Sequence, residues 1–200
     1  MRLETISGDD PREMLRALRA AVLGSGPAIS VGMPTSAVDA AARPASREVP
    51  AGTAVVVTTS GSSGVPKSVM LSRSALTSSA LSTAARIGEG AWLLARPASY
   101  GAGLQVLVRS LVQGHEPAIL SGKFTAEAFA ATALGMTSSV GGTRVPSYTS
   151  LVPAQLGTLL DAAPHDPSVA DALRSFEAIL IGGQALPAAM AARADELGVK

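Results

Sequence analysis

The stretch from Thr58 to Ser68, which reads Thr-Thr-Ser-Gly-Ser-Ser-Gly-Val-Pro-Lys-Ser, constrains what this chain can fold into more than any other feature. It directly follows the apolar run Ala54–Val57, which is typical of a buried strand, and it precedes a segment with helical character from Ser72. A loop rich in glycine and hydroxyl groups can direct several backbone N–H groups at one anion, and its lysine adds a positive charge. The stretch therefore predicts a binding site for a nucleotide polyphosphate.

Two other interpretations of this loop fit less well. A Walker A loop, G-x-x-x-x-G-K-[ST], needs a glycine directly before Lys67, and the chain has Pro66 there. Proline lacks the N–H group and has a fixed φ angle, so it cannot supply that contact to a phosphate. A flexible surface turn is disfavoured because the β-branched run ends immediately before the loop.

The segment Thr59–Lys67 resembles the phosphate-binding signature of the adenylate-forming enzymes, the acyl-CoA synthetase and ligase superfamily, which reads [ST]-S-G-[ST]-T-G-x-P-K. Only Ser63 departs from this pattern, and it keeps a hydroxyl group where the family has threonine. The proline that contradicts a Walker A loop is part of this signature. The resemblance implies that the phosphates of ATP bind at Thr59, Ser60, Gly61, Ser62, Ser63, Gly64 and Lys67.

Composition indicates a globular α/β protein. Of the residues, 47% are hydrophobic and 16% are charged, and the net charge of +1 gives no electrostatic case for nucleic acid or a membrane surface. The absence of cysteine excludes disulfides and thiolate metal sites. No apolar run approaches the ~20 residues of a membrane-spanning helix, and the N-terminus lacks the apolar region of a signal peptide. We therefore expect a cytoplasmic protein.

From Ala54 onward, strand-like and helix-like segments alternate, which predicts a mainly parallel sheet flanked by helices. The expected strands are Ala54–Thr58, Ala91–Ala95, Glu116–Leu120, Ser138–Val140 and Ala178–Ile181. The expected helices are Ser72–Ile87, Gly103–Gln113, Thr125–Leu134, Val152–Asp161 and Pro187–Leu197. Residues 1–50 form a leader with a helix from Asp10 and a loop that includes a short extended piece at Ala28–Val31, and residues 51–200 form the core. The resemblance identifies the whole as the N-terminal part of an AMP-binding domain.

Further loops carry residues that the resemblance assigns to an acyl and adenine pocket. In the family a P-x-x-H-x-x-G segment borders the acyl group, and this chain has Tyr100 at the histidine position, which leaves any role of an imidazole in doubt. A G-G-x-x-[LM]-P segment follows the last strand. The implied pocket residues are Tyr100, Gly101, Gly103, Thr149, Ser150, Gly182, Gly183, Gln184 and Leu186. Taken alone, these residues also fit a structural aromatic side chain, a helix cap and a tight turn.

Within the superfamily, the short leader and the segments Gly103–Leu111 and Tyr148–Leu156 are most similar to actinobacterial o-succinylbenzoate–CoA ligases of menaquinone synthesis. In the family reaction a carboxylate attacks the α-phosphate of Mg·ATP, pyrophosphate leaves, and the thiolate of coenzyme A displaces AMP. The resemblance thus implies ATP with Mg²⁺ and coenzyme A as substrates, and no tightly bound cofactor. It leaves a homodimer open.

The family's later segments, Y-G-x-[ST]-E, T-G-D and a small lid domain with the catalytic lysine, do not occur in these residues. We therefore predict no catalytic residue and no metal ligand in this chain, and we expect an N-terminal portion that is inactive alone. The alternatives are a non-catalytic nucleotide- or acyl-binding module and a ligase for another aryl or acyl acid. The remaining candidates, His115, His165, Lys123 and Arg144, are interpreted as solvated loop residues.

Overall fold

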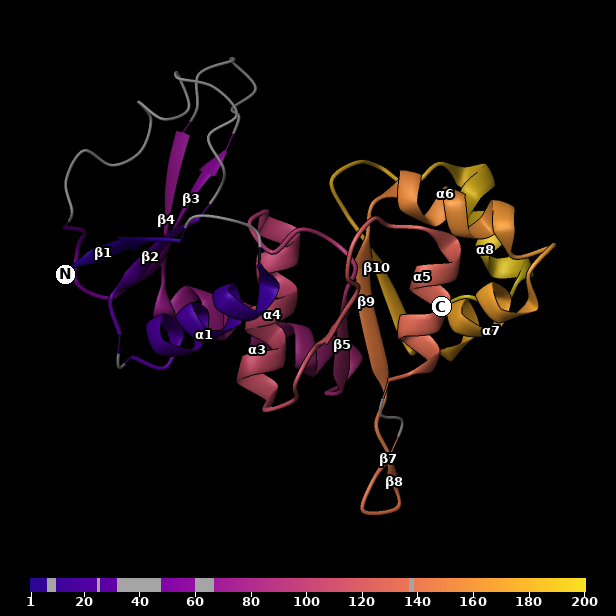
Figure 1. The fold of residues 1–200 in the computed structure, drawn as a ribbon, viewed down its shortest axis with the longest axis horizontal. Helices are drawn as coiled ribbons and strands as arrows, with labels where there is room; N and C mark the ends of the chain where they lie inside the picture. Colours follow the sequence, from indigo (N-terminus) through magenta and orange to yellow (C-terminus); the bar gives the residue numbers. More distant parts are fainter. Residues whose placement is uncertain (7–9, 25, 32–47, 60–66, 137–138) are drawn as a thin grey trace. The chain divides into compact units, whose positions relative to one another are not determined.

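The computed structural model describes residues 1–6, 10–24, 26–31, 48–59, 67–136 and 139–200 (Figure 1). The chain forms two compact units. The first unit consists of Met1–Ser82 and Pro97–Val108, and the second unit consists of Thr83–Arg96 and Arg109–Lys200. The first unit thus joins the leader to the strand that enters the predicted phosphate loop.

The first unit contains a sheet in the order β1-β2-β3-β4. Its strands are β1 (Leu3–Thr5), β2 (Ala28–Val31), β3 (Thr53–Thr59) and β4 (Lys67–Ser72). The first three strands run parallel, and β4 runs antiparallel to β3. The prediction of β3 is confirmed, and the expected extended piece is β2. All four residues of β2 and the apolar run Ala54–Val57 of β3 are buried, as expected for strands with both faces covered.

Helix α1 (Pro11–Val22) begins where the sequence predicts. The carboxylate of Asp10 accepts a hydrogen bond from the N–H group of Arg12 at 2.9 Å, and Pro11 occupies the first turn. The buried side chains recur at helical spacing: Met14, Leu15, Leu18, Ala21 and Val22. At the other end, Nε of Arg73 donates to the carbonyl oxygen of Ala21 at 2.8 Å. This contact fixes the start of helix α3 (Arg73–Ile87) against the end of α1.

The segment after the phosphate loop differs from the expectation. Residues 67–72 form β4, which was not expected, whereas the predicted helix is confirmed as α3, which begins at Arg73, one residue after the expected start. Strand β4 lies at an edge of its sheet and is largely exposed, with Val69 and Met70 at 43% and 56% exposure. An exposed edge strand needs no alternation of buried side chains, so its sequence gives little strand signal.

The second unit contains a four-stranded sheet in the order β10-β9-β5-β6, all parallel. Its strands are β5 (Ala91–Leu94), β6 (Ala118–Ile119), β9 (Ser147–Leu151) and β10 (Ala178–Ile181). The α/β class with a mainly parallel sheet is confirmed. The organisation differs from the prediction, because the expected strand Ala54–Thr58 belongs to the first sheet, as β3, and not to this one. Strand β9 was not expected, and the segment near residue 140 is a separate antiparallel hairpin of β7 (Ser139–Val140) and β8 (Thr143–Arg144).

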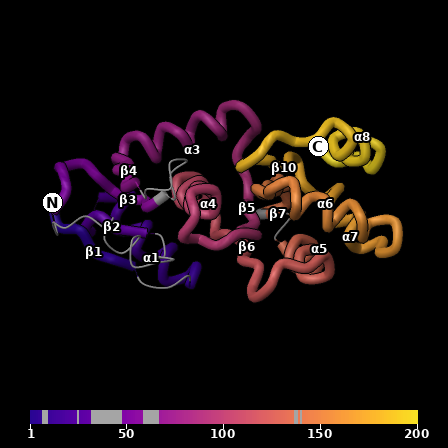
Figure 2. Tube along the Cα trace, turned by 90° about the horizontal axis from the view of Figure 1, so that it is seen from above, coloured from indigo at the N-terminus to yellow at the C-terminus, as the bar shows by residue number. Residues whose placement is uncertain are grey.

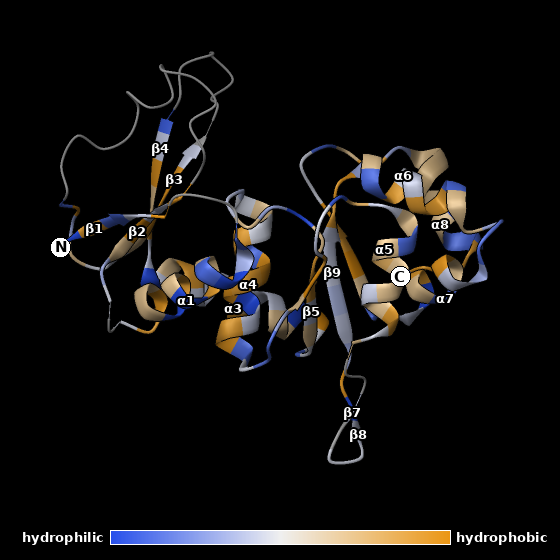
Figure 3. Cartoon of the chain, in the orientation of Figure 1, coloured by the Kyte–Doolittle hydropathy of each residue, from blue (hydrophilic) through white to orange (hydrophobic). Residues whose placement is uncertain are grey.

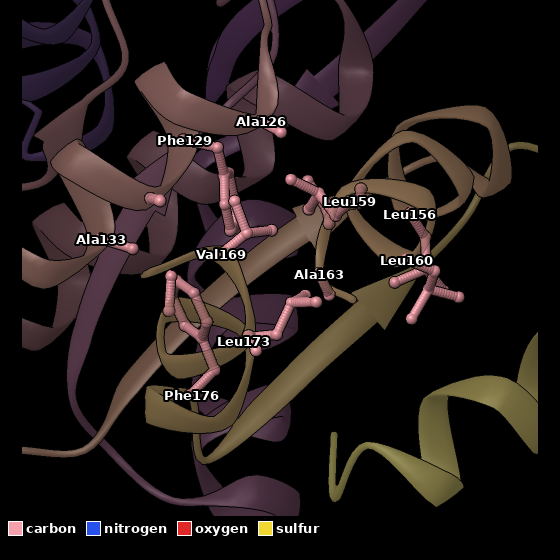
Figure 4. Packing of buried hydrophobic residues seen from close by; sticks show 14 of the residues in the cluster. Ala126, Phe129, Ala133, Leu156, Leu159, Leu160, Ala163, Val169, Leu173 and Phe176 are labelled. Atoms are coloured by element: carbon pink, nitrogen blue, oxygen red, sulfur yellow. The ribbon is translucent and has the colours of Figure 1, made fainter. Parts of the chain in front are cut away.

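Helix α4 (Gly101–Gln113) runs from the first unit into the second. The other helices are α5 (Ala126–Leu134), α6 (Pro153–Ala162), α7 (Pro167–Ser175) and α8 (Ala188–Glu196). Figures 1 and 2 show α5 to α8 on one side of the second sheet. Their shared core centres on Phe129 and Phe176, whose ring centroids are 5.7 Å apart (Figure 4). This core holds β5, β9 and β10 from one face.

Candidate functional site

The predicted phosphate loop connects the two strands of an antiparallel hairpin. Thr59, the last residue of β3, is the register partner of Lys67, the first residue of β4. Strand β3 is parallel to β2, and the loop follows the carboxyl end of β3. Ligands of parallel sheets bind beyond the carboxyl ends of the strands. Lys67 lies exposed at this end of the hairpin. The predicted ligands Ser60, Gly61, Ser62, Ser63 and Gly64 lie outside the described residues.

This strand–loop–strand arrangement bears on the Walker A alternative. A Walker A loop runs from a strand into a helix, and its lysine and hydroxyl residue open that helix. Here Lys67 and Ser68 open a strand, and both pair with β3. The hairpin therefore contradicts a Walker A loop at this position, in agreement with Pro66.

The segment from Pro97 to Gly103 lies in the first unit, at the start of α4. The Tyr100 side chain is 57% exposed. A Cβ atom at Gly103 would lie 2.1 Å from the carbonyl oxygen of Pro97, so the glycine permits a close approach of the helix to its own entry loop. A Cβ atom at Gly101 would meet no atom within 4 Å. Gly103 is thus required by the close packing of α4 on its entry loop, whereas the space beside Gly101 could hold a side chain.

Three strands of the second unit end at one edge of their sheet, because β10, β9 and β5 are parallel neighbours. The N–H group of Gly182, directly after β10, donates to the carbonyl oxygen of Leu151 at 3.1 Å. Gly183 has a φ angle of +85°, which favours glycine, and a Cβ atom there would lie 3.3 Å from a methyl group of Val152. The predicted G-G turn thus packs onto the exit of β9.

Thr149 and Ser150 are brought to this same edge, but their side chains point to opposite faces of the sheet. The buried Thr149 hydroxyl donates to the carbonyl oxygen of Leu93 at 3.0 Å and thereby joins β9 to β5. Helix capping, the alternative for these residues, is wrong, because the cap of α6 is Val152. Beyond the G-G turn, Gln184 and Leu186 are exposed, and Leu186 borders a cavity of about 120 Å³ beside β10 and α8.

Sequence reasoning missed Arg109 on α4. Its guanidinium carbon lies 4.9 Å from the ring centroid of Trp92, and its Nε is buried without a hydrogen-bond partner within the described residues. Burial lowers the pKa of Arg109. No carboxylate of the described residues forms an ion pair with it. The available signal was a single arginine in the apolar run Leu104–Leu111.

Arg109 shares a face of the second sheet with a predicted pocket residue. Trp92 and Tyr148 are register partners with ring centroids 5.2 Å apart. Ser150, two residues after Tyr148, points to the same face. A guanidinium group and a hydroxyl group, both of which can donate hydrogen bonds to a carboxylate, thus lie on this face of the sheet.

The other charged candidates have surface roles. Arg144 forms an ion pair with Glu177 at 3.2 Å, and Lys123 and His165 are exposed. The described residues contain no group of three His, Asp or Glu side chains that could hold a metal ion. No helix in the same residues is long and apolar enough to cross a membrane.

Comparisons with known proteins show the family of the chain. A family model described as AMP-binding enzyme matches residues 6–200. The probable 2-succinylbenzoate–CoA ligase of Mycobacterium tuberculosis (strain CDC 1551 / Oshkosh) is 39% identical over 188 residues, which are 92% of this chain and 46% of that protein. The chain therefore spans about half the length of the curated relatives it matches.

Solved structures show the same fold. A malonyl-CoA ligase with methylmalonyl-CoA and AMP bound has a TM-score of 0.75 at 21% identity, covering 98% of this chain and 49% of its own. The o-succinylbenzoate coenzyme A synthetase of Bacillus subtilis, in complex with AMP, has a TM-score of 0.57 at 26% identity and covers 73% of this chain and 28% of its own.

Proposed function

The chain belongs to the AMP-binding enzyme family, and from this premise we propose that it is part of an ATP-dependent acid–CoA ligase. The observation that carries the proposal is the signature Thr59–Lys67 at the carboxyl end of β3, where strand ends bind ligands. Residues 1–50 are proposed as a leader and residues 51–200 as the core of the N-terminal part of the AMP-binding domain. We also propose a cytoplasmic location and small molecules as partners.

In the proposed reaction, the residues of the phosphate loop bind the β- and γ-phosphates of Mg·ATP. The acid carboxylate forms a bond to the α-phosphorus, and the bond to pyrophosphate breaks. The thiolate of coenzyme A then attacks the acyl carbon and AMP leaves. Charge develops on pyrophosphate in the first step, and Lys67 together with the N–H groups of the loop would stabilise it.

We propose o-succinylbenzoate as the acid. The support is the 39% identity to a protein named as a probable 2-succinylbenzoate–CoA ligase. This acid has two carboxylates, so one stays anionic after the other is adenylated, and its pocket needs a cation. Arg109 meets that need, because it is half-buried, stacked on Trp92 and without an acidic partner among the described residues. The residues assigned from the sequence to acyl or adenine contacts stay part of the proposal: Tyr100, Gly101, Gly103, Thr149, Ser150, Gly182, Gly183, Gln184 and Leu186. Among them, Thr149 would act indirectly, because its buried hydroxyl is bonded to Leu93 on the opposite face from Ser150.

Product analysis tests this function. The full-length product of the gene is incubated with Mg·ATP, coenzyme A and o-succinylbenzoate, and the thioester and AMP are measured by mass spectrometry. We expect one thioester for each AMP released. ADP as the nucleotide product, or AMP without a thioester, would contradict an acid–CoA ligase.

A further inference from the structure

We infer that Gln155 is a positioning residue that sets the separation between the exits of β5 and β9; this inference rests on the proposed function. Gln155 lies in the first turn of α6 and makes two hydrogen bonds to backbone groups. Its Oε1 accepts from the N–H group of Val152 at 3.1 Å, and its Nε2 donates to the carbonyl oxygen of Ala95 at 2.9 Å. Val152 and Ala95 are the first residues after β9 and β5.

The two bonds require a carboxamide. The N–H group of Val152 needs an acceptor, and the carbonyl group of Ala95 needs a donor, and among side chains of this length only glutamine has both on one planar group. Ala95 is buried and Gln155 is half-buried. Loss of either bond therefore leaves a backbone group poorly solvated, which costs more than the loss of an exposed bond.

The other exits of the sheet are joined by backbone groups. The N–H group of Leu120 donates to the carbonyl oxygen of Leu94 at 3.0 Å, and that of Gly182 donates to Leu151. Between β5 and β9 the last register pair is Leu93 and Thr149, and beyond it Gln155 connects the two chains. The distance between these two exits thus depends on a side chain.

The two exits border the proposed acid pocket. Ser150, a proposed pocket residue, lies two residues before Val152, and Gly182, another, donates to the carbonyl oxygen of Leu151 at the same exit. A change in the spacing of the exits should alter the fit of the acid and leave the phosphate loop unaffected, because that loop belongs to the hairpin of β3 and β4. Gln155 should therefore influence the KM for the acid more than the KM for ATP.

The experiment uses the full-length product of the gene with two variants. Gln155→Glu keeps an acceptor for Val152 and places a carboxylate against the carbonyl group of Ala95, whereas Gln155→Met removes both bonds at similar length. The matched control is Thr158→Ala, which removes an exposed hydrogen bond to Ala154 one turn further along α6. We expect both Gln155 variants to raise the KM for the acid about tenfold. The KM for ATP should stay within about twofold in all three variants.

Two outcomes would overturn the inference. Equal KM values for the acid in Gln155→Glu and wild type would do so, as would a loss of thermal stability in both variants with no change in either KM. If the wild type activates no acid, the proposed function fails. Hydrogen exchange at the Val152 amide then still tests whether Gln155 makes the positioning contact. The contact predicts protection of this amide in wild type and Gln155→Glu and its loss in Gln155→Met, and equal exchange in all three would contradict it.

Discussion

Thr59 and Lys67 are register partners across the antiparallel ladder of β3 and β4. The chain between them therefore leaves one strand and returns beside it, and the lysine of the signature stands next to the threonine that opens it. Lys67 thus lies exposed at the end of the hairpin that the predicted phosphate loop joins.

Replacement of Lys67 should slow adenylation, the step in which pyrophosphate leaves. The Lys67→Ala variant of the full-length protein removes a cation that would offset the charge developing on pyrophosphate. We expect the rate of adenylation to fall about 100-fold. The control is Lys123→Ala, which removes the same charge from an exposed loop of the second unit and should keep the wild-type rate. Equal rates in wild type and Lys67→Ala would contradict the assigned role.

Arg109 should discriminate between acids with one and two carboxylates. Arg109→Met would remove the proposed charge-assisted hydrogen bond to the second carboxylate of the acid. This loss should raise the KM for o-succinylbenzoate about 10- to 100-fold. The KM for benzoate, which lacks the second carboxylate, should not change. Arg86→Met, an exposed arginine of α3, is the control. An equal rise in both KM values would indicate a packing role for Arg109.

The second unit should depend on its aromatic core. Phe129 is fully buried between Phe124 and Phe176, with centroid distances of 5.8 and 5.7 Å. Phe129→Ala should therefore reduce the free energy of unfolding by about 3–5 kcal/mol, measured by urea denaturation. Leu134→Ala, at a position 50% exposed on the same helix, should change it by about 0.5 kcal/mol or less. Similar losses in both variants would disagree with this core.

Asp166 should make stability depend on pH in the acidic range. Its carboxylate accepts from the hydroxyl and the N–H group of Ser168 at 2.7 and 2.9 Å, and these bonds lower the pKa of Asp166. A carboxyl group whose pKa is lowered by folding stabilises the folded state at pH values above its unfolded pKa. This contribution is lost as the pH falls through the folded pKa. The urea midpoint of wild type should thus lie above that of Asp166→Asn near neutral pH, and the difference should shrink as the pH falls below the ordinary range of carboxyl pKa values. A pH-independent difference would contradict this role.

Sequence reasoning predicted the elements that have strong patterns or clear ends. The cap signal at Asp10 and Pro11 located α1, and the apolar runs located β3, β5 and β10. The same signal, an aspartate followed by a proline, occurs at Asp166 and Pro167, where α7 begins. That helix was therefore predictable.

Strand β9 could not be predicted from apolar content. Figure 3 shows it in pale colours between the more hydrophobic β5 and β10. Its polar atoms are satisfied by contacts distant in sequence: the Tyr148 hydroxyl donates to the carbonyl oxygen of Ile87 at 2.6 Å, and the Thr149 hydroxyl donates to Leu93. Burial, followed by the charge of Glu177, raises the pKa of Tyr148. Such partners belong to the fold, so a local pattern cannot reveal them.

The candidate site was predictable to a similar extent. The signature Thr59–Lys67 identified the phosphate loop, because its glycines, hydroxyl groups and lysine occur in one short segment. Arg109 and Gln155 were missed, since their importance comes from Trp92 and Ala95, which are reached only through folding.

The central claim is that the full-length protein activates a carboxylic acid with ATP, and ATP–pyrophosphate exchange tests it most directly. The assay measures transfer of labelled pyrophosphate into ATP without coenzyme A, using o-succinylbenzoate, benzoate and a fatty acid in parallel. We predict exchange that requires o-succinylbenzoate and exceeds the rate with the other acids. Absence of exchange with o-succinylbenzoate in a folded protein would contradict the proposed substrate, and absence with every acid would contradict acid activation.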